Sequence, residues 1–139
     1  IKPMDNLHKN HLHVTCAIIE HNGRVLSAKR SETMSMAHKW EFPGGKIRTG
    51  ESREDGLLRE IMEELAMVVS IRRALSPCTH DYGDVTVTLY PFVCGVEKGT
   101  PICREHSAIV WLDPEDLPSL DWAEADIPVV RAYLDYLAT

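Results

Sequence analysis

The sequence has no run of apolar residues approaching the 18 to 20 or so that a membrane helix needs. It also has no charged start followed by an apolar stretch and a small-residue cleavage site. Aromatic residues make up only 6% of the 139 residues, but 44% are hydrophobic and the net charge is −6, which excludes a disordered chain. We therefore expect a soluble, cytoplasmic protein that makes no membrane contact, with a weak preference for a monomer.

Cysteines are few, and they form no C-x-x-C pair and have no histidine at zinc-ligand spacing (Cys16, Cys78, Cys94, Cys103). A broad basic face is missing too, since residues 1–50 carry eight basic and four acidic side chains while residues 51–139 carry seven and seventeen. We therefore expect no zinc site, no disulfide framework and no stable nucleic-acid partner. Local cations beside an acidic region instead suit a small polyanion that is bound partly through a metal ion.

The pattern of the chain predicts an α/β domain over residues 11–139. Residues 1–10 show no periodicity and are set aside as a disordered or vector-derived tail. Two β-rich stretches, 12–20 and 24–30, flank Asn22-Gly23 and predict a hairpin. Further strands are expected at 40–42, 68–75, 85–96 and 107–112, then a helical turn at 113–117 and a closing helix at 127–137 capped by Asp126. Together these elements predict a mixed sheet flanked by two helices.

The first helix is predicted over residues 52–65, with Ser52 as its N-cap. Its apolar side is marked by residues spaced three and four apart (Leu57, Leu58, Ile61, Met62, Leu65). Glu60, Glu63 and Glu64 fall within about 60° of one another, where like charges oppose the helix. Such a cluster is either a solvated acidic face or a site for a hard divalent cation such as Mg²⁺ or Mn²⁺.

The residues that precede this helix favour the metal site. Gly45, Glu51 and the run Arg59–Glu64 match the pattern G-x5-E-x7-R-E-U-x-E-E-x-G-U at every position but the last glycine, where Ala66 stands. This is the Nudix box, and with the segment 40–47 the chain resembles the MutT-like branch of the Nudix hydrolases. The resemblance implies a Nudix α/β/α sandwich, with the mixed sheet between helices, and hydrolysis of a nucleoside triphosphate to the monophosphate and pyrophosphate. Ala66 is expected to cost about 1 kcal/mol if it adopts a left-handed conformation.

The resemblance also implies roles for single residues. Glu60, Glu63, Glu64 and Glu105 would bind Mg²⁺ or Mn²⁺ with the Gly44 carbonyl, and either Glu60 or Glu105 would be the general base, with Glu64 also assigned to catalysis. Arg59 and Glu51 would be structural, because the Arg59 guanidinium can reach Glu63 one turn on. His106, next to Glu105, is expected to face solvent.

Substrate contacts implied by the resemblance are Arg30, Glu41, Phe42 and Asp126. Each has a simpler explanation, since Arg30 could be a surface cation, Phe42 a core residue and Asp126 a helix cap. Asp126 stands where the 8-oxo-dGTP enzymes have asparagine, and an ionised aspartate can only accept hydrogen bonds. The substrate is left open between a CTP-type nucleotide and an oxidised dNTP such as 8-oxo-dGTP.

Two other functions stay open. One is a catalytically silent Nudix domain that senses nucleotides, and the other is a Nudix hydrolase of another nucleoside diphosphate derivative. The retained glutamates argue against the first, and no additional specificity motif after the box supports the second.

Overall fold

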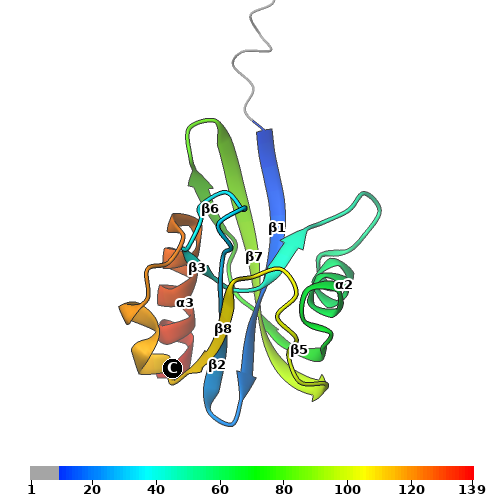
Figure 1. Cartoon of the computed structure of the whole chain (residues 1–139), viewed down its shortest axis with the longest axis vertical. Coiled ribbons are helices and arrows are strands. Elements are labelled where there is room, and N and C mark those ends of the chain that lie inside the picture. Colours follow the sequence, from blue (N-terminus) through cyan, green and yellow to red (C-terminus); the bar gives the residue numbers. More distant parts are fainter. Residues whose placement is uncertain (1–9) are drawn as a thin grey trace, which may run out of the picture.

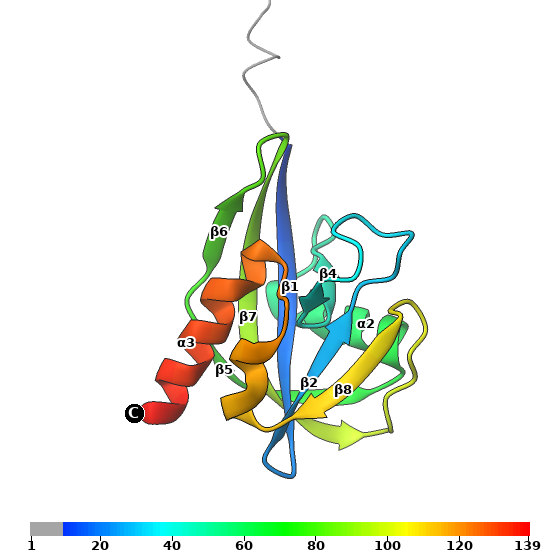
Figure 2. The same ribbon diagram turned by 60° about the vertical axis from the view of Figure 1, so that its left-hand side comes forward.

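A computed structural model describes residues 10–139, which form three layers with a mixed sheet between helices (Figures 1 and 2). The main strand order is β3-β2-β1-β7-β5, with β4, β6 and β8 pairing with β1, β7 and β2. The strands are β1 (Asn10–His21), β2 (Arg24–Lys29), β3 (Trp40–Glu41), β4 (Gly44–Lys46), β5 (Val68–Ala74), β6 (Cys78–Asp81), β7 (Val85–Lys98) and β8 (Ala108–Leu112). The helices are α2 (Arg53–Leu65), η1 (Pro114–Ser119), η2 (Glu124–Asp126) and α3 (Ile127–Ala138).

The centre of the sheet is a long parallel pair of β1 and β7, in register from Asn10 opposite Val85 to Glu20 opposite Gly95. Residues 15–19 of β1 are buried on both faces of the sheet, which explains the apolar run Cys16–Ile19 in the middle of the strand. Cys16 and Ile18 point into the core on the α3 side, while Ala17 and Ile19 point into the core on the α2 side. This confirms the predicted α/β/α arrangement.

Most predicted elements are present, with three differences. Asn10 belongs to β1 and not to the tail, while residues 1–9 lie outside the described part. Gly44 and Gly45, which lie outside the predicted strands, belong to β4 and pair with β1. Strand β6, which the sequence pattern does not predict, pairs with β7.

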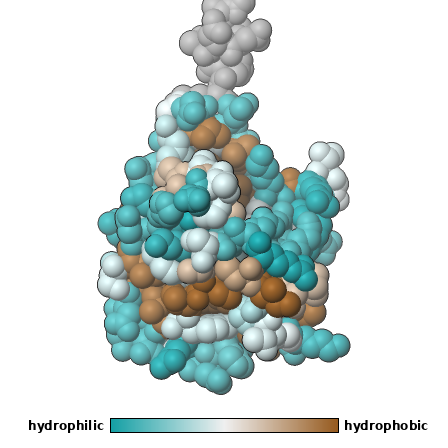
Figure 3. Space-filling model, viewed as in Figure 1, coloured by the Kyte–Doolittle hydropathy of each residue, from teal (hydrophilic) through white to brown (hydrophobic). Residues whose placement is uncertain are grey.

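Helix α2 begins as predicted, since the Ser52 hydroxyl accepts a hydrogen bond from the Asp55 amide at 3.0 Å. Its buried face is narrower than predicted: Leu57, Ile61 and Leu65 are in the core, but Leu58 and Met62 are 38% and 43% exposed. Among residues 10–139, no helix has the length and hydrophobicity to span a membrane. Figure 3 shows a mostly hydrophilic face crossed by an apolar band at the level of β8, a strand whose five residues are all half-buried.

Ala66 ends α2 in the left-handed conformation, with φ 56° and ψ 37°. A Cβ atom strains this conformation, so we expect Ala66→Gly to raise the free energy of unfolding by about 1 kcal/mol. The measurement is urea unfolding of the two proteins. Ala74→Gly, in the exposed end of β5, is the control and should lower stability. A loss of stability in Ala66→Gly would contradict this assignment of strain.

Candidate active site

A cleft of ≈ 770 Å³ lies on the α3 side of the β1–β7 pair, toward the end of the sheet where β1 begins. Its apolar wall comes from alternate residues of the two strands, Leu12 and Val14 of β1 and Val87 and Leu89 of β7. Its charged side chains and its histidine come from other segments of the chain (Arg30, Glu41, Lys46, Glu64, Asp84, Glu105, His106, Asp126). The cleft therefore offers an apolar surface at one side and a concentration of carboxylates at the other.

Glu64 is the most buried carboxylate of α2, at 7% exposed. Burial, and then the charges of Glu41, Glu60 and Glu105, raise its pKa to about 9, although a hydrogen bond from the Gly44 amide opposes this shift. Among residues 10–139, its buried Oε1 atom has no hydrogen-bond partner. The surroundings of Glu64 are thus short of positive charge.

Arg59 binds three carboxylates: Glu51 in the preceding loop and Glu60 and Glu63 of α2. Its guanidinium donates to both oxygens of Glu51, at 2.6 and 2.9 Å, and to the carbonyl oxygen of Lys46 at 3.0 Å. It also donates to Glu60 and Glu63, each at 3.0 Å. The hydrogen bonds from Arg59, with one from the Arg48 amide, lower the pKa of Glu51 to about 2. The predicted contact with Glu63 is confirmed, and the Glu51 contacts attach the preceding loop to α2.

The two glycines before this loop are required by close packing. A side chain on Gly44 would collide with the carbonyl oxygen of Thr15, which belongs to the neighbouring strand. A side chain on Gly45 would occupy the space of the Glu60 carboxylate. Both glycines thus allow the β4 backbone to approach β1 and α2 closely.

His106 is buried, so the expectation that it faces solvent is wrong. Its Nε2 lies 2.7 Å from one Glu41 oxygen, and the other Glu41 oxygen accepts from Arg30 at 2.7 Å. Arg30 also donates to the carbonyl and hydroxyl of Ser35, at 2.6 and 3.2 Å. Arg30 is therefore part of the cleft and not a free surface cation.

Asp126 does not cap α3 with its side chain, which corrects the expectation from the sequence. The carboxylate instead accepts a hydrogen bond from the Phe42 amide at 3.0 Å and is 5% exposed. Burial and the neighbouring Glu41 charge hold the pKa of Asp126 well above its usual range. This environment shifts Asp126 toward its protonated form, in which a carboxyl both donates and accepts, as asparagine does. The argument that residue 126 can only accept therefore applies to the ionised form alone.

Phe42 is a core residue, 3% exposed, and its ring packs on Trp122 with 4.7 Å between centroids. The side chain is not among those that line the cleft, so burial in the core is the better supported of its two expected roles. Tyr82 lines the cleft instead, and its hydroxyl accepts from the Ala125 amide at 2.8 Å. The sequence carried no signal for Tyr82, because it follows the strand that was not predicted.

The predicted metal ligands lie at or near the cleft but are not arranged as a preformed metal site. Glu64, Glu105 and Gly44 line the cleft, whereas the carboxylates of Glu60 and Glu63 are bonded to Arg59. Within the described range 10–139, no three acidic, histidine or cysteine side chains converge closely enough to hold a metal ion. The donor chemistry still fits a hard divalent cation, because carboxylates surround an unpaired, buried Glu64 oxygen.

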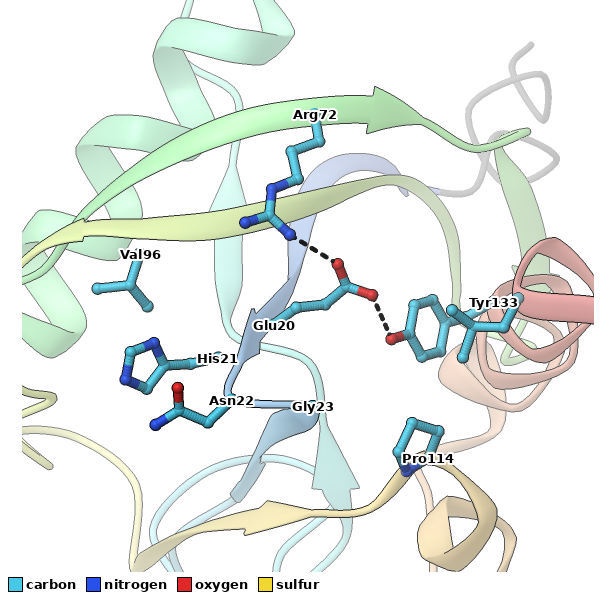
Figure 4. Close-up of a pocket in the computed structure, with 9 residues that line it drawn as sticks. Glu20, His21, Asn22, Gly23, Arg72, Val96, Pro114 and Tyr133 are labelled. Atoms are coloured by element: carbon cyan, nitrogen blue, oxygen red, sulfur yellow. Dashed lines mark hydrogen bonds and ion pairs between the residues drawn. The ribbon is translucent and has the colours of Figure 1, made fainter.

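A second cavity, of ≈ 330 Å³, lies at the other end of β1, beside the Asn22–Gly23 turn (Figure 4). Glu20 accepts there from Arg72 at 3.0 Å and from the hydroxyl of Tyr133 at 2.6 Å. The absence of a side chain on Gly95 leaves room for the Arg72 guanidinium. The charges in this cavity pair with each other, so the carboxylate-rich cleft is the better candidate for chemistry.

Comparisons with known proteins agree with the geometry. Residues 9–133 match the family model of the NUDIX domain. The CTP pyrophosphohydrolase of Escherichia coli is 32% identical over 88% of this chain and 91% of that protein. The 8-oxo-dGTP diphosphatase of Escherichia coli is 28% identical over 86% of this chain and 93% of that protein.

Solved structures show the same architecture. The E. coli ORF135 protein superposes with a TM-score of 0.81 at 32% identity, covering 94% of this chain and 93% of that one. The MutT protein from Methanosarcina mazei Go1 has a TM-score of 0.85 at 22% identity, over 96% and 99% of the two chains, and so supports the fold alone. The domain match and these relatives show that the chain is a member of the Nudix family.

Proposed function

We propose that the protein is a Mg²⁺- or Mn²⁺-dependent pyrophosphohydrolase that converts a nucleoside triphosphate to the monophosphate and pyrophosphate. The observation that carries this proposal is the single cleft that holds the Glu64 and Glu105 carboxylates together with Arg30, Glu41 and Asp126. A nucleotide has a polyanionic end and a polar aromatic end, and the cleft has groups suited to both. Relatives named CTP pyrophosphohydrolase and 8-oxo-dGTP diphosphatase support the same reaction.

Nudix hydrolases generally use a divalent metal ion. In this chain the ligands would be the carboxylates of Glu64 and Glu105 and the carbonyl of Gly44, all at the cleft. Glu60 and Glu63 would join them after release from Arg59. A bound metal would neutralise phosphate oxygens and make a bound water more acidic. The buried, unpaired oxygen of Glu64 is the observation that supports this use of the site.

The chain itself must bind and orient the nucleotide and accept a proton from the attacking water. Glu60 and Glu105 are the two candidates to accept the proton, since both lie near Glu64, which lines the cleft. At the other end, the apolar wall would contact the flat face of the base, with Asp126, Arg30 and Glu41 at its polar edge. A neutral Asp126 is compatible with cytosine and with 8-oxoguanine, so both substrate classes stay in the proposal.

Purified protein should release pyrophosphate from at least one of CTP, dCTP, 5-methyl-dCTP, dGTP and 8-oxo-dGTP when Mg²⁺ is present. Glu64→Gln should lower kcat by about 100-fold or more while leaving nucleotide binding measurable, because only the charged carboxylate can bind the metal. Glu54→Gln, on the exposed first turn of α2, is the matched control and should retain activity. Binding without turnover in the wild-type protein would indicate a nucleotide sensor, and no turnover of any nucleotide would refute the proposal.

The pH dependence of stability provides a second test. The folded-state pKa of Glu64 is about 9, above its ordinary 4.5, so the folded protein binds the extra proton between these values. Without metal, the free energy of unfolding should therefore fall as the pH rises from about 5 to 8, on the order of 1 to 3 kcal/mol from this group. Glu64→Gln should flatten the slope, and Mg²⁺ should stabilise the wild-type protein more at pH 8 than at pH 5. Parallel slopes for both proteins would contradict the assignment.

Asp126 provides the third test. Asp126→Asn should keep kcat/KM within about fivefold at pH 6, because the amide supplies the donor and acceptor of the protonated acid. Asp126→Ala should lower kcat/KM about 10- to 100-fold, since the Phe42 amide loses its partner and the base loses a contact. The measurement is steady-state kinetics on the preferred nucleotide. Equal losses in both variants would show that the ionised form is the one in use.

A further inference from the structure

His106 connects two loops across the cleft through a continuous series of contacts. Its Nε2 contacts Glu41 at 2.7 Å, Glu41 contacts Arg30 at 2.7 Å, and Arg30 donates to the Ser35 carbonyl at 2.6 Å. The first loop carries Glu105, one residue before His106, and the second, residues 31–39, borders the cleft through Met34, Ser35 and Met36. The two ends of the cleft are thus joined by side chains and not only by the sheet.

The backbone around His106 is positioned by two hydrogen bonds. The Cys103 thiol lies 3.0 Å from the His106 carbonyl, and the next residue, Ser107, donates its amide to Lys29 at 2.9 Å. The side chain of His106 is only 2% exposed. The ring therefore approaches Glu41 from the segment that leads into β8.

The ring has a single polar contact. Its Nδ1 is buried and, among the residues described, has no hydrogen-bond partner. A buried lone pair without a partner costs less than a buried N–H without one, so the network assigns the proton to Nε2, which donates to Glu41. Within the described residues, the His106 side chain therefore makes one polar contact, and that contact orients the Glu41 carboxylate.

Glu41 needs two donors because of where it lies. Its side chain is 19% exposed, and it is close enough to Glu64 and Asp126 to raise the pKa of both. Arg30 and His106 bind its two oxygens separately, which fixes the plane of the carboxylate. With either donor removed, a largely buried carboxylate keeps one partner and repels its acidic neighbours.

We propose that His106 is a positioning residue for nucleotide recognition: it fixes Glu41 and, through Glu41, holds Arg30 and the 31–39 loop at the base end of the cleft. The kinetic part of the proposal rests on the proposed function. His106 does not contact the reacting phosphate in this assignment, so it should affect the binding of the base and not the chemical step.

The kinetic test compares His106→Ala with His106→Gln, whose amide can present an N–H where Nε2 lies. We expect His106→Ala to raise KM for the preferred nucleotide about tenfold with kcat within about threefold, and His106→Gln to restore most of the loss. Arg72→Ala, which removes the Glu20 partner at the other end of β1, is the matched control and should leave both constants unchanged. A fall in kcat at unchanged KM, or equal losses in the Ala and Gln variants, would overturn the proposal.

A double variant tests the path through Glu41. His106 and Arg30 contact Glu41 on opposite oxygens, so His106→Ala combined with Arg30→Lys should raise KM by less than the product of the single effects. Multiplicative effects would show that the two side chains act independently, contrary to the proposal.

A measurement without turnover separates this inference from the function. In the 31–39 loop the amides of Met34, His38 and Lys39 donate to backbone carbonyls. We expect His106→Ala, but not Arg72→Ala, to speed hydrogen exchange at these amides at least fivefold in the ligand-free protein, with β5 unchanged. This result would support the positioning role even if the wild-type protein hydrolysed no nucleotide. Unchanged exchange together with an unchanged KM would refute it.

Discussion

The arrangement of the cleft depends first on the Arg59 guanidinium. It joins the Glu51 carboxylate and the Lys46 carbonyl to α2 while also binding Glu60 and Glu63 on its own helix. A planar cation with five donors can make all of these contacts at once, whereas lysine could not. The loop that begins at the two glycines is thereby fixed against the helix that carries the carboxylates. Arg59 also offsets the negative charges of Glu60 and Glu63. Glu64 makes no such contact with Arg59 among the residues described, and it is buried near other acidic side chains.

Much of the fold could be predicted from local pattern. The Asn22–Gly23 turn, the amphipathic spacing of α2 and the Ser52 cap are all short-range signals, and each is present. The parallel pairing of β1 with β7 could not be predicted in this way, because its partners are about 75 residues apart in the chain. Strand β6 was missed for a related reason: its four residues are only partly buried and depend on β7 for pairing.

In the site, too, contacts between neighbours in the chain could be predicted, whereas contacts between distant segments could not. The contact of Arg59 with Glu63 could be predicted, since the two residues are one turn apart on one helix. Contacts across the cleft were mistaken where they depended on tertiary structure. Phe42 proved to be a core residue, His106 a buried one, and Asp126 a partner of the Phe42 amide, although their residue types suggested a base contact, a solvent-facing position and a helix cap.

The grip on Glu41 from both sides has an evolutionary consequence. A single replacement of Arg30, Glu41 or His106 would leave a buried charge or donor without its partner. Evolutionary intermediates that change only one of the three residues would therefore be less stable. Among relatives of this chain, the three positions should therefore change together, as alternative sets, and not one at a time. Divergence toward a different base would then proceed through coordinated replacement of the trio, while the carboxylate helix a short distance away stays as it is.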